Sequence, residues 1–100
     1  MSSIRHKNQF GKLKKMIVSI LRKQGVKKAA LFGSIARGDA TDKSDIDMLI
    51  EFDRGKSLLD LAGLKIELQE QLKRKVDVLT YKSLHPLLKG KILSEQKVIL

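Results

Sequence analysis

The sequence predicts a small α/β domain in which helices pack against a short mixed sheet of three or four strands. Segments with apolar residues at helical spacing alternate with short runs in which every second residue is apolar. The chain has 100 residues and is 42% hydrophobic, which is typical of one folded unit. We therefore expect a single domain over residues 1–100. It comprises a basic helix at about 8–24, a central segment at about 28–80 that carries the candidate catalytic residues, and a C-terminal helix and tail at about 83–100.

The first helix is predicted between Asn8 and Gln24. Its apolar residues recur at helical spacing at Phe10, Leu13, Ile17, Ile20 and Leu21. Its basic residues fall on the opposite arc, at Lys12, Lys15, Arg22 and Lys23. We expect an amphipathic helix with a basic outer face, which Gly25 ends.

Two strands and a loop should follow. Residues 28–32 indicate a short buried strand that ends at Gly33, and residues 34–44 form a loop with room for one helical turn. In residues 45–52 a period of two separates two faces. One face carries Ile46, Met48, Ile50 and Phe52, and the other carries Asp45, Asp47, Leu49 and Glu51. We expect the first face to lie in the core.

In the second half of the chain we expect a helix, a strand, a second helix and a C-terminal tail. Ser57 and Asp60 have the spacing of a capping box, and a helix should run from there to about Arg74. Its predicted apolar stripe is Leu58, Leu61, Leu68 and Leu72, widened by Leu59, Ala62, Leu64 and Ile66. Residues 75–80 predict a third strand. Residues 83–94 predict a last helix with Pro86 in its first turn, before an apolar tail at 98–100.

Composition excludes several classes of site. The chain has no cysteine, so it has neither a disulfide framework nor a thiolate zinc site. His6 and His85 have no partner pattern and are interpreted as surface residues. No apolar run is long enough to cross a bilayer and no secretion signal is visible, so we expect a cytoplasmic protein with no membrane partner.

The net charge of +10 is unevenly distributed. Residues 1–38 contain ten Lys and Arg and no acid, whereas the remaining residues contain eleven of each sign. Such a basic segment is consistent with a polyanionic or acidic partner. It is equally consistent with a solvated lysine-rich surface, and the sequence leaves both interpretations open.

The main functional candidate is an acidic motif. Gly33-Ser34 is followed by ten residues and then by Asp45-Ile46-Asp47, and Asp77 lies on the next predicted strand. Carboxylates at i and i+2 on a strand point the same way, with Cα atoms about 6.5 Å apart. Asp45, Asp47 and Asp77 could therefore hold divalent metal, and Mg²⁺ is the best candidate because it prefers hard oxygen ligands and serves phosphate chemistry. Two such ions would support an in-line displacement.

The neighbouring residues suit a phosphate. Gly33 allows the backbone to come close to a phosphate, and Ser34 offers it a hydroxyl. Arg37 is a candidate to pair with phosphate oxygens, although a structural salt bridge to Asp39 or Asp42 is an alternative.

Three further polar residues need separate interpretations. Lys65 falls in the middle of an apolar stripe. Either its stem reaches the sheet edge, or its ammonium reaches the acidic cluster or the phosphates of a bound triphosphate. Ser44 could contact the metal ligands, but a role in closing the loop is favoured. Glu51 lies about 13 Å along the strand from Asp47 and is left out of the site.

These motifs resemble the minimal nucleotidyltransferase family of the polymerase-β superfamily. The similar segments are Leu31 to Gly38 and Ser44 to Ile50, and Asp77 matches that family's third acid. The resemblance extends from about Phe10 to Ile92 and implies the polymerase-β-like nucleotidyltransferase fold.

The resemblance also implies an activity. Members use Mg²⁺ and a nucleoside triphosphate, usually ATP, to transfer a nucleoside monophosphate to a hydroxyl. By this resemblance Gly33 and Ser34 hold the triphosphate, Asp45 and Asp47 bind metal, and Asp77 completes the site. Many members are antitoxins that add AMP to a tyrosine of a HEPN-domain ribonuclease toxin. The alternatives are a binding module that neutralises a protein without catalysis and, less favoured, a nucleic-acid binder that uses the basic first helix.

Overall fold

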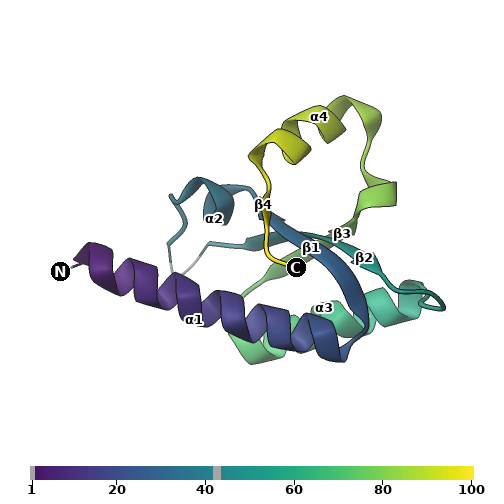
Figure 1. Cartoon of the computed structure of the whole chain (residues 1–100), viewed down its shortest axis with the longest axis horizontal. Helices are drawn as coiled ribbons and strands as arrows, with labels where there is room; N and C mark the ends of the chain where they lie inside the picture. The colour runs from purple at the N-terminus through teal and green to yellow at the C-terminus, as the bar shows by residue number, and fades with distance from the viewer. Residues whose placement is uncertain (1, 42–43) are drawn as a thin grey trace.

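The computed structural model describes residues 2–41 and 44–100, with side chains from Gly11 onward. Its elements in chain order are α1 (Ser2–Lys23), β1 (Val26–Phe32), α2 (Ser34–Arg37), β2 (Ile46–Phe52), α3 (Leu58–Leu72), β3 (Val76–Thr80), the 3₁₀ turn η1 (Tyr81–Ser83), α4 (Pro86–Glu95) and β4 (Lys97–Val98). The strands form one sheet in the order β3-β2-β1-β4 (Figure 1). The predicted α/β class and the four-stranded sheet are confirmed.

The sheet is mixed, as predicted. Strand β1 is antiparallel to β2 on one side and to β4 on the other, whereas β2 and β3 are parallel. Parallel neighbours need a crossover, and α3 supplies it. This connection brings the beginnings of β2 and β3, which are far apart in sequence, to the same end of the sheet.

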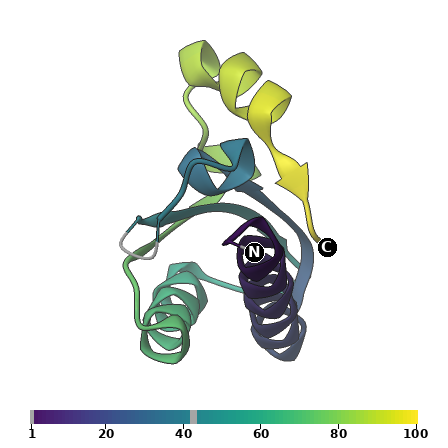
Figure 2. The ribbon, with the colours of Figure 1, turned by 90° about the vertical axis from the view of Figure 1, so that its left-hand side faces the viewer.

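Helices α1 and α3 cover one face of the sheet, and α2 and α4 lie on the other side (Figure 2). The main core lies under α1 and α3. It contains the predicted inward face of β2 together with residues of both helices, among them Ile17, Leu21, Ile46, Met48, Ile50, Leu64 and Leu68, all fully buried. The expectation that Phe10 joins this face lies outside the described side chains.

The second face of the sheet is less open than predicted. Leu49, which alternation places on the same face as Asp45 and Asp47, is fully buried. Its cross-strand partner Ala30 is also fully buried, and Leu84 nearly so. Helices α2 and α4 lie on this side, and Asp47 and Glu51 remain partly exposed along β2.

The predicted stripe of α3 is wrong at its beginning. Leu64, Leu68 and Leu72 are buried as expected, but Leu58 and Leu59 are 82% and 83% exposed. Ile66 is also 55% exposed. A helical period identifies a face, but it does not show how far along the helix the facing surface extends.

This difference gives a stability test. Leu68→Ala should lower the free energy of unfolding by about 2–5 kcal/mol, because a fully buried leucine leaves a cavity. Leu59→Ala removes the same atoms from an exposed position and should change it by less than about 0.5 kcal/mol. Urea unfolding of both variants measures this difference, and equal losses would contradict the assigned core.

The C-terminal tail is a strand rather than a loose apolar segment. Lys97 and Val98 pair with β1, and the Ile99 N–H donates to the Ala29 carbonyl at 2.9 Å. The Ala29 N–H in turn donates to the Leu100 carbonyl at 3.0 Å. A segment this short is too brief to display a period of two. Two other elements begin earlier than predicted. Helix α1 begins at Ser2 rather than near residue 8, and β1 begins at Val26 rather than at residue 28.

The capping box at Ser57 and the place of Pro86 in a first helical turn are confirmed, although α4 begins at Pro86 rather than at residue 83. The Ser57 N–H donates to the Asp60 carboxylate at 2.7 Å, and this backbone hydrogen bond lowers the pKa of Asp60. Pro86 occupies the first turn of α4, where the exposed His85 precedes it and accepts the Leu87 N–H on Nδ1 at 3.1 Å. His85 thus has a capping role that its sequence position did not suggest. Within the described residues, no helix is both long and apolar enough to cross a membrane.

Candidate active site

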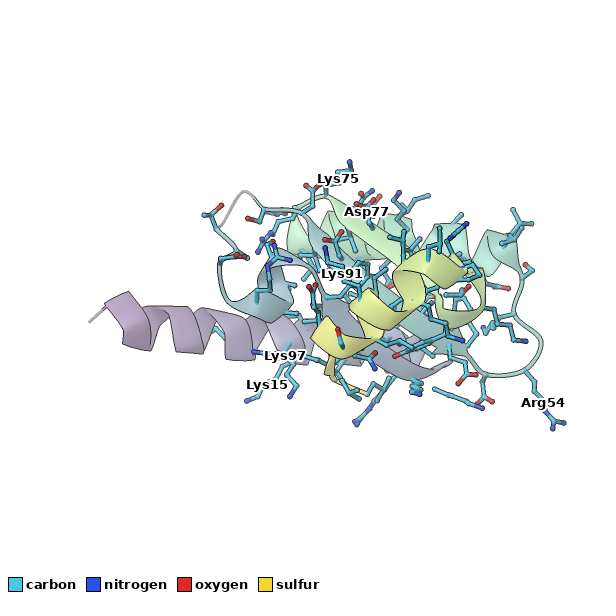
Figure 3. The ribbon with its side chains drawn as sticks, turned by 90° about the horizontal axis from the view of Figure 1, so that it is seen from above. Lys15, Arg54, Lys75, Asp77, Lys91 and Lys97 are labelled. Atoms are coloured by element: carbon cyan, nitrogen blue, oxygen red, sulfur yellow. The ribbon has the colours of Figure 1, made fainter. Side chains whose placement is uncertain are left out.

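The three predicted acids converge at one end of the sheet. In the parallel pairing of β2 and β3, Asp47 lies directly beside Asp77, and on the other side of β2 it pairs with Phe32. The carboxyl end of β1 therefore meets the amino ends of β2 and β3. Asp45 precedes β2 at the same end, and its side chain is 48% exposed. Figure 3 shows Asp77 beside Lys75 along this edge.

Gly33 brings the backbone against the acids. Its φ of 72° and ψ of −151° lie in a region that only glycine populates freely. A Cβ added here would collide with a carboxylate oxygen of Asp47 and lie 3.3 Å from its Cγ. The local backbone therefore requires glycine both for its conformation and for its closeness to Asp47.

The helical turn after Gly33 is α2. The Gly33 carbonyl accepts the N–H groups of Ala36 and Arg37, each at 3.1 Å, and Gly38 ends the turn in the left-handed region with φ 84°. Ser34 is half-buried at the start of this turn, directly after the glycine that contacts Asp47. The backbone of Gly33 thus lies against Asp47, and Ser34 follows it directly in the chain.

The acids repel one another. Burial raises the pKa of the Asp47 carboxyl, and the negative charges of Asp77 and Asp45 raise it further. Arg37 and Lys75 oppose this shift but do not reverse it. Because the charges of Asp77 and Asp45 add to the effect of burial on Asp47, a cation bound beside Asp47 would be stabilised here.

Two lysines form ion pairs with Asp45 and Asp77. The Lys75 ammonium lies 3.8 Å from Asp45, and the Lys65 ammonium lies 3.9 Å from Asp77. Of the two interpretations of Lys65, the structure shows the one in which the ammonium reaches the acidic cluster. Lys75 was missed, although its position just before Val76 places it at the same end of β3 as Asp77.

Arg37 is engaged by carboxylates of the chain itself. It lies 3.4 Å from Asp39 and 3.8 Å from Glu95 of α4. The structural salt bridge considered as an alternative is therefore present, and the Asp42 version of it lies outside the described residues. Arg37 also lowers the pKa of Asp47, so its charge acts on the acidic cluster. The ion pair with Glu95 links the site to α4, which sequence spacing gave no means to foresee.

The loop before Asp45 is fastened by Arg74. Its guanidinium donates to the Ser44 carbonyl at 2.7 and 3.1 Å and to the Thr41 carbonyl at 2.9 Å. The Ser44 hydroxyl oxygen accepts the Thr41 N–H at 2.8 Å, which is the predicted role in closing the loop. Arg74 was missed by sequence reasoning, because a surface arginine at a helix end carries no signal of its target.

Glu51 does not belong to this site. Glu51 pairs with Lys27 at 3.9 Å on another part of β2 and was correctly left out. The side chain of His6 lies outside those the structure describes. Among the described side chains, no set of three or more Asp, Glu, His or Cys is arranged to hold a metal ion alone. An ion held by one or two of these carboxylates would complete its coordination with water or with oxygens of a bound substrate.

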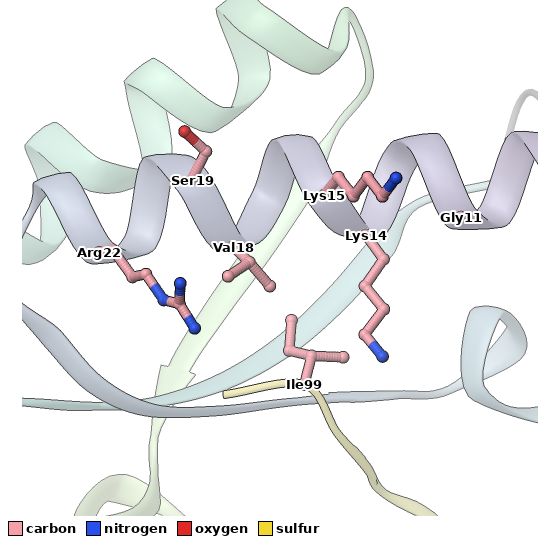
Figure 4. Close-up of a pocket in the computed structure, with 7 residues that line it drawn as sticks. All are labelled: Gly11, Lys14, Lys15, Val18, Ser19, Arg22 and Ile99. Atoms are coloured by element: carbon pink, nitrogen blue, oxygen red, sulfur yellow. The ribbon is translucent and has the colours of Figure 1, made fainter.

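A groove of about 650 Å³ lies elsewhere on the molecule, between α1 and the C-terminal tail (Figure 4). Its described lining combines basic and small or apolar side chains, namely Gly11, Lys14, Lys15, Val18, Ser19, Arg22 and Ile99. None of the predicted site residues lines it. In Figure 3, Lys15 lies on the opposite side of the molecule from Asp77. The basic face of α1 is thus separate from the acids.

Comparison with protein families identifies a match over most of the chain. The family described as nucleotidyltransferase domain matches residues 13–99. A Methanocaldococcus jannaschii protein provisionally named a protein adenylyltransferase is 57% identical over 86 residues, which cover 86% of this chain and 92% of that protein.

Solved structures share the fold. One, provisionally described as a minimal nucleotidyltransferase, has a TM-score of 0.73 at 36% identity and covers 84% of this chain and 86% of its own. Another is the complex of a tri-AMPylated Shewanella oneidensis HEPN toxin with an MNT antitoxin. It matches with a TM-score of 0.72 at 19% identity and covers 91% of this chain and 71% of the matched chain. At that identity the second likeness concerns the fold alone.

Proposed function

The chain belongs to the nucleotidyltransferase domain family and is a nucleotidyltransferase, and we propose that it transfers AMP from ATP to a hydroxyl of a protein. The observation that carries this proposal is the pairing of Asp47 with Asp77 directly beside the backbone of Gly33. A backbone that can approach phosphate closely, beside two carboxylates, supports a site for a nucleoside triphosphate and a metal ion. The name of the Methanocaldococcus jannaschii relative, a protein adenylyltransferase, supports a protein as the acceptor.

Mg²⁺ fits the chemistry of these residues. Asp45 and Asp47 offer hard carboxylate oxygens. Burial raises the pKa of Asp47 and repulsion from Asp77 and Asp45 raises it further, and a divalent cation would relieve that repulsion. Mg²⁺ is commonly held by one or two carboxylates together with substrate phosphates, so a cage made only of protein ligands is not required. When bound, the ion supplies charge stabilisation for the transferring phosphoryl group. Asp77 is proposed as the third acid of the site.

The proposed reaction balances as a simple displacement. The acceptor hydroxyl oxygen forms a bond to the α-phosphorus of ATP, and the bond from that phosphorus to the pyrophosphate oxygen breaks. The hydroxyl proton passes to Asp77 or to water beside it, and pyrophosphate leaves. Gly33 and Ser34 bind the triphosphate, and Arg37 contacts its oxygens once they compete with Asp39 and Glu95 for the guanidinium.

We propose a tyrosine of a HEPN-domain toxin as the acceptor, which would make the chain an antitoxin acting in the cytoplasm. Support comes from the fold shared with the MNT antitoxin bound to an AMPylated HEPN toxin. A nucleic-acid acceptor is not favoured, because the described basic groove is separate from the acids.

The test uses ATP that is labelled on either its α-phosphate or its γ-phosphate. The chain is incubated with Mg²⁺ and a HEPN-domain protein of the same organism. Label from the α-phosphate should appear on that protein, whereas label from the γ-phosphate should leave as pyrophosphate. Replacing the modified tyrosine by phenylalanine should abolish the α-label. If no protein acquires the α-label, the proposed reaction is overturned. If the label appears on a residue other than tyrosine, only the assignment of tyrosine as the acceptor is overturned.

A further inference from the structure

Lys65 is unusual for its place in α3. It lies among the leucines that face the sheet, where an apolar residue is expected, and it follows the fully buried Leu64 directly. Its side chain is nevertheless 43% exposed, and its ammonium lies 3.9 Å from the Asp77 carboxylate. The leucines hold the backbone of Lys65 in place, so its reach toward the end of the sheet is fixed by the packing of the crossover helix.

The two lysines of the site come from different places. Lys75 lies next to β3, two residues before Asp77, and pairs with Asp45. Lys65 comes from the middle of α3 and pairs with Asp77. Asp45 and Asp77 thus each have one ammonium within 4 Å. Lys65 is the cation that the helix layer contributes to this cluster.

The ion pair of Lys65 and Asp77 adds little to stability. Both side chains are more than two-fifths exposed and their charged atoms are 3.9 Å apart. Exposed pairs of this kind typically contribute about 0–1 kcal/mol. The effect of the ammonium therefore falls mainly on where the Asp77 carboxylate lies, since Asp77 would otherwise be pushed away from Asp47, its direct neighbour.

We infer that Lys65 is a positioning residue for the transfer reaction, which holds the Asp77 carboxylate beside Asp47 without contacting the nucleotide. The inference rests on the proposed function, in which Asp77 serves the acceptor hydroxyl. It assigns Lys65 to the acceptor side of the reaction. Arg37 and the backbone of Gly33 remain on the triphosphate side.

The test is Lys65→Met, which keeps most of the packing stem and removes the charge. We expect kcat to fall by about 10- to 100-fold, because small displacements of a reacting group cost rates of this order. The KM for ATP should stay within about threefold, since uniform substrate binding is unaffected. Lys65→Arg should restore most of kcat, because a guanidinium can reach the same exposed carboxylate.

A second measurement does not depend on activity. Without ATP, the Mg²⁺ concentration that gives half of the thermal stabilisation should fall by about three- to tenfold in Lys65→Met, because a cation near the acids has been removed. Lys27→Met is the matched control. Lys27 forms an equally long, exposed pair with Glu51 away from the site, and its loss should leave both measurements unchanged.

The outcomes separate the inference from the proposed function. A wild-type chain that transfers no label fails the proposed function itself. A wild-type chain that is active, together with a Lys65→Met variant indistinguishable from Lys27→Met, overturns the inference alone. A raised KM for ATP with unchanged kcat would also overturn it, since Lys65 would then bind the triphosphate instead of positioning Asp77.

Discussion

Replacing Asp45 and Asp47 together by Asn should abolish AMP transfer without unfolding the domain. We expect a loss of at least about 10³-fold in kcat/KM, since charge stabilisation by a held metal ion amounts to several kcal/mol and about 1.4 kcal/mol corresponds to a factor of ten. The Tm without Mg²⁺ should stay the same or rise. Burial and the neighbouring carboxylates raise the pKa of Asp47, so removing these charges relieves repulsion.

The control for this variant is Asp53→Asn with Glu70→Gln, which removes the same charge from exposed positions outside the site. It should keep full activity. The measurements are transfer of α-labelled AMP and thermal unfolding with and without Mg²⁺. If the Asp45 and Asp47 variant still neutralises the partner without transferring AMP, the alternative of a non-catalytic binding module is favoured. Transfer at the wild-type rate would remove the proposed mechanism.

Gly33→Ala should damage both stability and activity. The methyl group would collide with the Asp47 carboxylate, and alanine resists the positive φ of 72°. Strained backbone of this kind costs about 1–3 kcal/mol. Displacing Asp47 or the backbone that binds phosphate should lower kcat/KM by about 100-fold or more. Urea unfolding and the transfer assay measure the two effects.

Gly55→Ala is the matched control, because Gly55 has a φ of 85° but open space around it. The free energy of unfolding of this variant should fall by about 1–2 kcal/mol, which is the cost of the left-handed conformation for alanine. Its activity should not change. If the two alanine variants had equal activity, close contact between Gly33 and Asp47 would not matter for the reaction.

The strands and the direction of the acids could be predicted because local patterns determine them. Val76 and Val78 alternate with Asp77, and Ile46 and Met48 alternate with Asp47, so burial of the apolar residues turns the acids outward. The capping pair Ser57 and Asp60 is equally local. The exposure of Leu58 and Leu59 and the burial of Leu49 could not be predicted, since both depend on where distant elements end.

The partners of the charged residues around the site could not be predicted from the sequence, for a related reason. Arg74 contacts a loop 30 residues earlier, and Glu95 reaches Arg37 from α4. A charged surface residue has many possible partners, and only the tertiary fold selects one. Lys65 was the exception, because a charge within an apolar stripe is conspicuous and therefore drew attention before its partner Asp77 was known.

The parallel register between β2 and β3 makes the chemistry of this protein dependent on its hydrophobic packing. Asp47 and Asp77 are neighbours only while Val76 and Val78 occupy the core, and a slip of one residue would turn Asp77 toward the layer of α1 and α3. Insertions within residues 75–78 would therefore be far more damaging than insertions in the turn at 53–56. During evolution or design, that turn is where the length of the crossover is free to vary.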